Sequence, residues 1–149
     1  MAPPSALHTL IDLASKETDE AAKILGLALR ISEEAEQKLQ LLLQYRDDYA
    51  TRSQTSLAGG ISTTQFNNFQ MFMLKLEHAI SGQKKVTADA QDRTLQARAA
   101  WLVCEQKKKA FVTLAERAGK DAVRREHWRD QKQNDEHAAR RTQHKPNHS

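Results

Sequence analysis

Apolar residues recur along this chain with a period of seven, which predicts long α-helices that pack against each other as a coiled coil. From residue 7, the a positions of the first repeat are Leu7, Ala14, Ala21, Ala28, Ala35, Leu42, Tyr49 and Ser56. Its d positions are Leu10, Glu17, Ile24, Ile31, Lys38, Tyr45 and Arg52. Ile11, Leu25 and Leu39 widen the apolar stripe on its e side, so the stripe suits one partner helix or more.

A second repeat with the same period covers residues 66–118. Its a positions are Phe66, Met73, Ile80, Thr87, Thr94, Trp101, Lys108 and Ala115. Its d positions are Phe69, Leu76, Gln83, Ala90, Ala97, Cys104, Phe111 and Ala118. Strand patterns are absent from both halves of the sequence, so the fold class predicted is all-α.

The segment between the two repeats contains signals for a helix end and a helix start. The glycine pair at 59–60 can adopt the left-handed conformation that ends a helix. Ser62 and Gln65 have the spacing of a capping box, and Ile61 and Phe66 have that of a hydrophobic staple. We therefore expect the chain to fold back here, with facing residues whose numbers add up to about 120.

This register predicts which side chains meet across the seam. The expected pairs are Trp101 with Ala21, Phe111 with Leu10, Leu76 with Tyr45, Met73 with Tyr49, and Lys38 with Gln83. The first four combine complementary sizes or apolar groups, and the polar pair would fix the register at some cost in stability. The sequence thus predicts a long two-stranded antiparallel coiled-coil hairpin with a projecting C-terminal helix.

We expect a single coiled-coil domain over 1–149, with helices at about 5–57 and 63–140, a turn at 58–62 and a disordered tail at 141–149. Beyond about Ala118 the second helix has no antiparallel partner left in the molecule. There basic residues alternate with acidic ones, as in a solvated helix. They are Arg117, Lys120, Arg124, Arg125, Arg129, Lys132, Arg140 and Arg141, among Asp121, Glu126, Asp130, Asp135 and Glu136.

The composition agrees with extended helix, since 28% of the residues are charged and there are only 5 Gly and 3 Pro among 149. The single cysteine, Cys104, has no intrachain disulfide partner, which fits a reducing compartment. We expect no signal peptide and no transmembrane span, because no apolar run approaches bilayer length. The net charge of +4 permits an acidic partner without naming one.

Catalytic and metal-binding constellations are not recognisable. His127, His137, His144 and His148 lack cysteine partners, and Cys104 at a d position is interpreted as a small core residue. The glycine pair lacks the lysine and preceding strand of a phosphate-binding loop. A slim helical hairpin also offers little concave surface. We therefore expect no enzyme activity, no cofactor and no bound metal.

Surplus apolar side chains lie outside the a and d positions near the predicted turn. They are Leu41, Leu43, Met71, Phe72 and Leu74. Two helices cannot bury all of them, and exposed apolar surface of this kind marks either a partner site or a face for self-association.

Short segments spread over nearly the whole chain resemble the FliJ family, a component of the bacterial flagellar type III export apparatus. They include Asp19-Glu20-Ala21-Ala22, Glu34-Ala35-Glu36-Gln37-Lys38-Leu39, Gln44-Tyr45-Arg46-Asp47-Asp48-Tyr49, Asn68-Phe69-Gln70-x-Phe72, Leu76-Glu77-x-Ala79-Ile80, Trp101 and Gln131-Lys132-x-x-Asp135-Glu136. Each segment alone is common coiled-coil sequence, and together, with their spacing kept across the turn, they are fairly specific.

The resemblance implies a stalk like that of rotary ATPases, linking the export ATPase ring and its regulator to the cytosolic domain of the export gate. It also implies escort of export chaperones, and a location in the cytoplasm, peripheral to the inner membrane at the flagellar base. The gate-binding residues of the family correspond to Leu42, Tyr45, Tyr49, Phe72, Leu76 and Ala79. We add Arg124, Arg125 and Arg129 as expected contacts to the ATPase ring, on charge alone.

Two other functions remain open on the sequence. The first is a basic helical nucleic-acid-binding protein. Against it, acidic residues interrupt every basic run, and Trp128 is the one residue of the basic segment that could stack on a base. The second is a self-assembling coiled coil. Steep salt dependence of DNA binding would favour the former, and a stable parallel dimer without a hetero-partner would favour the latter.

Overall fold

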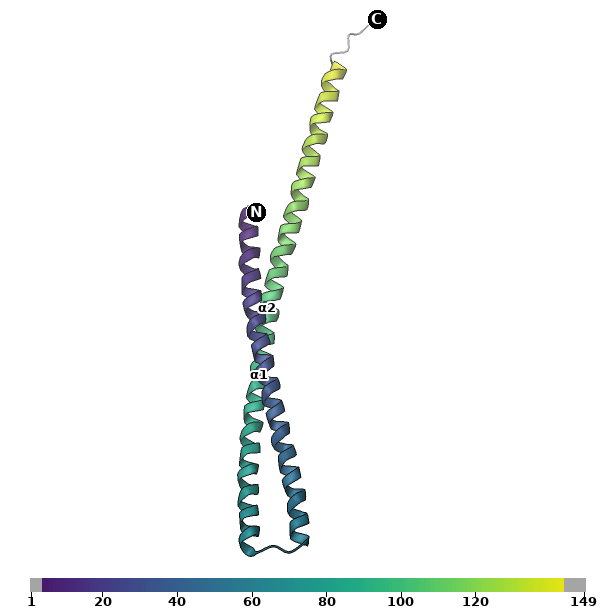
Figure 1. Ribbon diagram of the computed structural model, residues 1–149. Helices are drawn as coiled ribbons and strands as arrows, with labels where there is room; N and C mark the ends of the chain where they lie inside the picture. Colours follow the sequence, from purple (N-terminus) through teal and green to yellow (C-terminus); the bar gives the residue numbers. More distant parts are fainter. Residues whose placement is uncertain (1–3, 144–149) are drawn as a thin grey trace. The chain divides into compact units, whose positions relative to one another are not determined.

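The computed structural model describes residues 4–143, and regular structure within them is helical throughout (Figure 1). Helix α1 spans Pro4–Ala58 and helix α2 spans Thr63–Gln143. The all-α prediction is thereby confirmed. The terminal residues 1–3 and 144–149, which include most of the expected tail, His144 and His148, lie outside the described residues.

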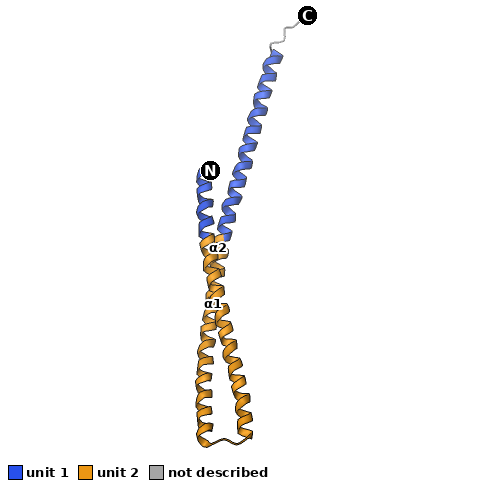
Figure 2. Cartoon of the chain, in the orientation of Figure 1, with its two compact units in different colours: residues 1–17, 105–149 blue, residues 18–104 orange. Residues whose placement is uncertain are grey.

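The two helices contribute to two compact units (Figure 2). One unit is Thr18–Cys104, in which the end of α1 and the beginning of α2 run antiparallel on either side of the turn. The other combines residues 4–17 of α1 with residues 105–143 of α2. The unit Thr18–Cys104 is the antiparallel hairpin that the sequence predicts.

The turn forms as its residue types require. Gly60 has φ of 82°, a left-handed conformation that costs glycine nothing, and its amide donates to the Leu57 carbonyl at 3.1 Å. The capping box is complete, because the Gln65 amide donates to Ser62 Oγ and the Ser62 amide donates to Gln65 Oε1, both at 3.2 Å. The predicted helix stop and helix start are both confirmed.

The centre of the hairpin is held by small and polar residues that let the two backbones approach closely. The Thr94 hydroxyl lies 3.2 Å from the Ala28 carbonyl oxygen, and the Thr87 hydroxyl lies 3.2 Å from that of Ala35. Gln83 Nε2 donates to the same Ala35 carbonyl at 3.1 Å. These partners have numbers that add up to about 120, so the predicted register is confirmed.

The seam on α2 follows the predicted repeat. Every a and d position from Phe69 to Ala118 is buried or half-buried, including the polar residues Gln83, Thr87, Thr94 and Lys108. Phe66, at the first predicted a position, is exposed. The heptad pattern therefore predicts correctly which residues of α2 are buried from Phe69 to Ala118.

The d positions predicted for α1 are wrong. All of them are exposed, and the seam instead uses the residue four places after each a position: Ile11, Thr18, Leu25, Ser32, Leu39, Arg46 and Ser53. Ser32 is a small seam residue between Ala28 and Ala35, whose carbonyl oxygens lie within hydrogen-bond distance of Thr94 and Thr87, whereas Ile24 and Ile31 are exposed. Lys38 is likewise exposed, so Gln83 meets the Ala35 backbone rather than Lys38.

The unit formed by residues 4–17 and 105–143 has a shorter seam. Leu7 and Ala14 are buried, and Lys107 Nζ lies 3.4 Å from Glu17 Oε2. Leu10, expected to face Phe111, has 38% of its surface exposed. Residues 122–143 are all exposed, as expected for the solvated part of α2.

Candidate protein interaction site

Aromatic rings from both helices gather near the turn. The Tyr49 ring stacks on Phe69 with centroids 5.2 Å apart and packs against Phe72 at 4.4 Å. Tyr45 lies 6.5 Å from Phe72 on the outer side of this cluster. The rings therefore form an aromatic cluster that packs across the two helices.

The six residues expected to bind the export gate occupy different depths of this region. Tyr45 is 59% exposed, Phe72 is 37% exposed and Ala79 is exposed, whereas Leu42 and Tyr49 are half-buried. Leu76 is buried in the seam at 7% exposure. The structure thus brings Tyr45, Tyr49 and Phe72 together, and Leu76 lies beneath the surface rather than on it.

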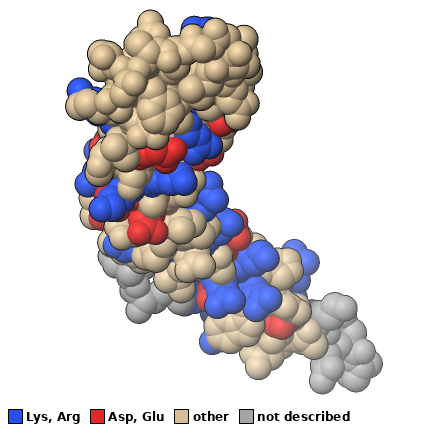
Figure 3. Space-filling view, turned by 90° about the horizontal axis from the view of Figure 1, so that it is seen from below, with Lys and Arg blue, Asp and Glu red and all other residues tan. Residues whose placement is uncertain are grey.

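The turn end also lacks charge. Residues 53–74 contain no acidic residue, basic residue or histidine, with Arg52 and Lys75 as the flanking charges. Seen from the turn end, a broad part of the surface is free of the blue and red of charged side chains (Figure 3). Met71 and Leu74 add exposed apolar area. This charge-free stretch is plain in the sequence and is a signal of the site that the heptad analysis missed.

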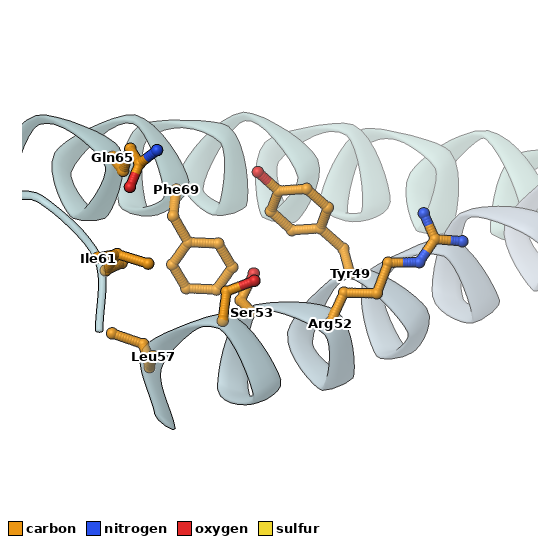
Figure 4. Close-up of a pocket in the computed structure, with 8 residues that line it drawn as sticks. Tyr49, Arg52, Ser53, Leu57, Ile61, Gln65 and Phe69 are labelled. Atoms are coloured by element: carbon orange, nitrogen blue, oxygen red, sulfur yellow. The ribbon is translucent and has the colours of Figure 1, made fainter. Parts of the chain in front are cut away.

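A shallow hollow lies between the helices beside the turn (Figure 4). Its volume is ≈ 300 Å³, and it is lined by Tyr49, Arg52, Ser53, Ser56, Leu57, Ile61, Gln65 and Phe69. Phe69 and Tyr49 extend into the space between the two helices, with Leu57 and Ile61 on the turn side. Its lining is mixed, with Arg52, Ser53, Ser56 and Gln65 beside the apolar and aromatic residues, and it contains no acid–base or nucleophilic pair.

The expected ATPase contacts Arg124, Arg125 and Arg129 are exposed on α2, in the unit that includes residues 105–143. Nearby, the Lys132 ammonium lies 5.2 Å from the centroid of the exposed Trp128 ring. This stretch therefore presents cationic groups along a solvated helix, as its composition predicts.

Clusters of metal-binding side chains and membrane-spanning helices are both absent among residues 4–143. No group of three or more His, Cys, Asp or Glu side chains there could hold a metal ion. Cys104 is a free, half-buried thiol, and His127 and His137 are exposed. Neither described helix is long and apolar enough to cross a membrane.

Fold and surface together define a helical-hairpin protein whose candidate site is an apolar, aromatic interaction surface. Comparison with known proteins identifies the family. The family described as "Flagellar FliJ protein" matches residues 4–147. The chain is 35% identical over 146 residues to the Flagellar FliJ protein of Salmonella typhi, covering 98% of this chain and 99% of that one. It is 34% identical, with the same coverage, to the Flagellar FliJ protein of Escherichia coli K12. The chain belongs to the flagellar FliJ family.

Proposed function

We propose that the chain is a non-enzymatic component of flagellar protein export, needed for flagellum assembly and motility. It links the export ATPase ring and its regulator to the cytosolic domain of the export gate, and it escorts export chaperones. It acts in the cytoplasm, peripheral to the inner membrane at the flagellar base, without nucleic acid and without inserting into the bilayer. The observation that carries the proposal is the aromatic surface near the turn, combined with membership of the FliJ family.

Gate binding is proposed for the turn end because exposed aromatic and apolar side chains lie there, next to the stretch of residues 53–74 that contains no charged residue. Tyr45 and Phe72 offer ring surface to a partner, and Tyr49 supports them from beneath. Aromatic residues on a preorganised scaffold lose little side-chain entropy on binding and are frequent centres of protein interfaces. Leu42 and Ala79 complete the rim, and Leu76 keeps the two helices in register below it.

ATPase binding is proposed for Arg124, Arg125 and Arg129 because their helix is solvated and basic. Guanidinium groups bind carboxylates in a bidentate manner, so an acidic surface on the ring would be recognised by charge. Such contacts weaken as salt rises, whereas apolar contacts at the turn end do not weaken in the same way. The two proposed contacts therefore differ in a property that can be measured.

The test is a binding assay with purified export ATPase and the cytosolic domain of the export gate. Tyr45→Asp should abolish gate binding and leave ATPase binding unchanged, because it places a charge on an exposed aromatic surface. Leu95→Asp is the matched control, since Leu95 is also exposed, at 63%, and lies on α2 away from the aromatic cluster. Circular dichroism checks that each variant stays helical. If wild-type protein binds neither partner, the linking function is wrong.

A further inference from the structure

Within the unit Thr18–Cys104, helix α1 carries a second stripe beside the one that it packs against α2. Both stripes share the a positions Ala21, Ala28, Ala35 and Leu42. The packed stripe adds five buried or half-buried residues on one side of them: Thr18, Leu25, Ser32, Leu39 and Arg46. The second stripe adds four exposed residues on the other side: Ile24, Ile31, Lys38 and Tyr45. The added residues of the packed stripe include two large apolar side chains and those of the exposed stripe include three, so α1 buries the less apolar of its two faces.

Open space adjoins the exposed stripe. It is a groove of ≈ 520 Å³ with residues of both helices in its walls: Ile24, Leu27, Ala28, Ile31, Val86, Asp89, Ala90, Arg93 and Ala97. Ile24 and Ile31 line this groove together with the α2 residues, yet they are 60% and 47% exposed. Protein interiors are close-packed, and here the packing between the helices is left open on one side. A turn of α1 about its own axis towards this side would bring the two isoleucines into the space between the helices.

Polar contacts to the backbone of α1 hold it in its present orientation. Gln83 Nε2 and the Thr87 hydroxyl lie 3.1 and 3.2 Å from the Ala35 carbonyl oxygen, and the Thr94 hydroxyl lies 3.2 Å from that of Ala28. Both acceptors belong to a positions, so the contacts depend on how far α1 is turned about its axis. Replacing the present seam by one that uses the exposed stripe requires a turn of about 50°, which shifts atoms at the Cα radius by about 2 Å. Such a shift breaks hydrogen bonds of this length.

The two orientations of α1 are stabilised by different interactions. The present one keeps the contacts to the two carbonyls, whereas the turned one buries Ile24 and Ile31 in exchange for Leu25 and Ser32. Each seam also includes one long cation, Arg46 in the present seam and Lys38 in the other, whose aliphatic part packs while its charge stays in water. Burial of an isoleucine and loss of a buried hydrogen bond have free energies of similar size and opposite sign here. The balance between the orientations is therefore close, and rotation of packed helices is a known form of switching.

We propose that α1 has two positions on α2, related by this rotation, and that the contacts to the Ala28 and Ala35 carbonyls select the present one. Tyr45 lies three heptads after Ile24, on the same exposed stripe. The rotation that buries Ile24 and Ile31 therefore also turns Tyr45 from the surface towards α2. The aromatic surface near the turn is complete in one position and loses Tyr45 in the other. The rotation does not depend on the proposed function, and only its effect on gate binding rests on that function.

Hydroxyl-radical footprinting of the full chain tests the rotation, because mass spectrometry then gives the oxidation rate of single side chains. The test variant combines three substitutions that remove the polar contacts and keep similar volumes: Gln83→Leu, Thr87→Val and Thr94→Val. In this triple variant the oxidation rates of Ile24, Ile31 and Tyr45 should fall about threefold or more, because each rate follows the fraction of molecules that exposes the side chain. The rates of Leu25 and Leu39 should rise in return.

Three further variants separate rotation from loss of packing. Leu25→Gln with Leu39→Gln weakens the present seam and leaves the polar contacts in place, so it should also protect Tyr45. Ile24→Gln with Ile31→Gln, added to the triple variant, should restore the oxidation of Tyr45, because the second seam then loses its isoleucines. Thr9→Val with Thr142→Val is the control and should change nothing, since these exposed hydroxyls bond to carbonyls one turn earlier in their own helices. Circular dichroism and sedimentation check the helicity and the oligomeric state of each variant.

An unchanged footprint in a triple variant that stays helical would overturn the proposal, and so would protection of Ile24 and Ile31 without protection of Tyr45. If the triple variant loses helicity, the variant with Leu25→Gln and Leu39→Gln decides in the same way. Protection that disappears on dilution would show that a second copy covers the stripe instead of α2. Binding to the cytosolic gate domain is measured separately, and the triple variant should bind about threefold or more weakly. Protection of Tyr45 with unchanged gate binding would support the rotation and contradict the proposed gate surface.

Discussion

At the scale of single residues, the hydroxyl of Thr87 joins the two helices at the centre of the hairpin. It is 4% exposed and lies 3.2 Å from the Ala35 carbonyl oxygen across the seam and 2.8 Å from the Gln83 carbonyl oxygen in its own helix. Its one proton is shared between these acceptors. A buried polar group with a partner in the other helix favours one register, because a slip would remove the hydrogen bond to Ala35 and leave only the one to Gln83.

Thr87→Val should therefore lower the free energy of unfolding by about 1 kcal/mol, since the methyl group keeps the volume but loses both hydrogen bonds. Urea unfolding followed by circular dichroism measures the change. Thr51→Val is the control, because the Thr51 hydroxyl is exposed and bonds only to the Asp47 carbonyl one turn earlier. If the two variants lose the same stability, the cross-helix hydrogen bond does not contribute.

The turn gives a second prediction at the same scale. Gly60 has φ of 82°, whereas Gly59 has no positive φ, and an added Cβ at Gly59 would meet the Ser56 carbonyl oxygen at an ordinary 3.6 Å. Gly60→Ala should destabilise the hairpin by about 1 kcal/mol, and Gly59→Ala should be neutral or slightly stabilising. Thermal unfolding of the two variants side by side measures this difference, and equal midpoints would contradict it.

At the scale of the helices, α1 carries two apolar stripes and buries only one of them against α2. Leu25 is half-buried in the seam, whereas its neighbour Ile24 is 60% exposed. Leu25→Ala should cost about 1–2 kcal/mol of unfolding free energy, and Ile24→Ala should cost less than about 0.5 kcal/mol. Chemical unfolding of this adjacent pair decides which stripe faces α2. The reverse order of costs would restore the d positions first predicted.

This pair of stripes explains what sequence can and cannot predict here. The repeat in α2 was predicted correctly because that helix has one clear seam, and the register followed from the turn. In α1 the periodicity cannot tell a stripe covered by α2 from one left exposed, because both are apolar and both repeat every seven residues. The burial of Leu25 and Ser32, beside the Ala28 and Ala35 carbonyls that Thr94 and Gln83 contact, shows which stripe faces α2.

The candidate site shows the same limit. The meeting of Tyr49 with Phe69 and Phe72 follows from the register, and so does its place near the turn. The depth of each residue does not, because Leu76 and Tyr45 are both apolar positions in the pattern although one is buried and the other exposed. The packed structure is therefore needed to tell which apolar side chains remain exposed.

At the scale of the whole molecule, one chain carries an aromatic surface beside a charge-free stretch and, elsewhere, a basic helix segment. Residues 53–74 contain no charge, while Arg124, Arg125 and Arg129 lie in the exposed segment 122–143. Binding through the first relies on apolar burial, and binding through the second relies on charge that salt screens. Linking two partners by one chain requires both surfaces on the same polypeptide, which is a stronger condition than binding each partner separately.

Complementation of cells that lack the protein, scored by swimming, tests that condition. One variant carries Tyr45→Asp, and the other carries Arg124→Glu, Arg125→Glu and Arg129→Glu; each should lose one proposed partner and keep the other. Neither should restore swimming to cells that lack the protein. Expressed together they should still fail, because each chain can hold only one end of the link. Cells with Leu95→Asp should swim normally and show that an exposed Leu→Asp change is tolerated. Recovery of swimming by the mixture would mean that the two surfaces act on separate molecules, and the chain would then be two independent adaptors rather than a physical link.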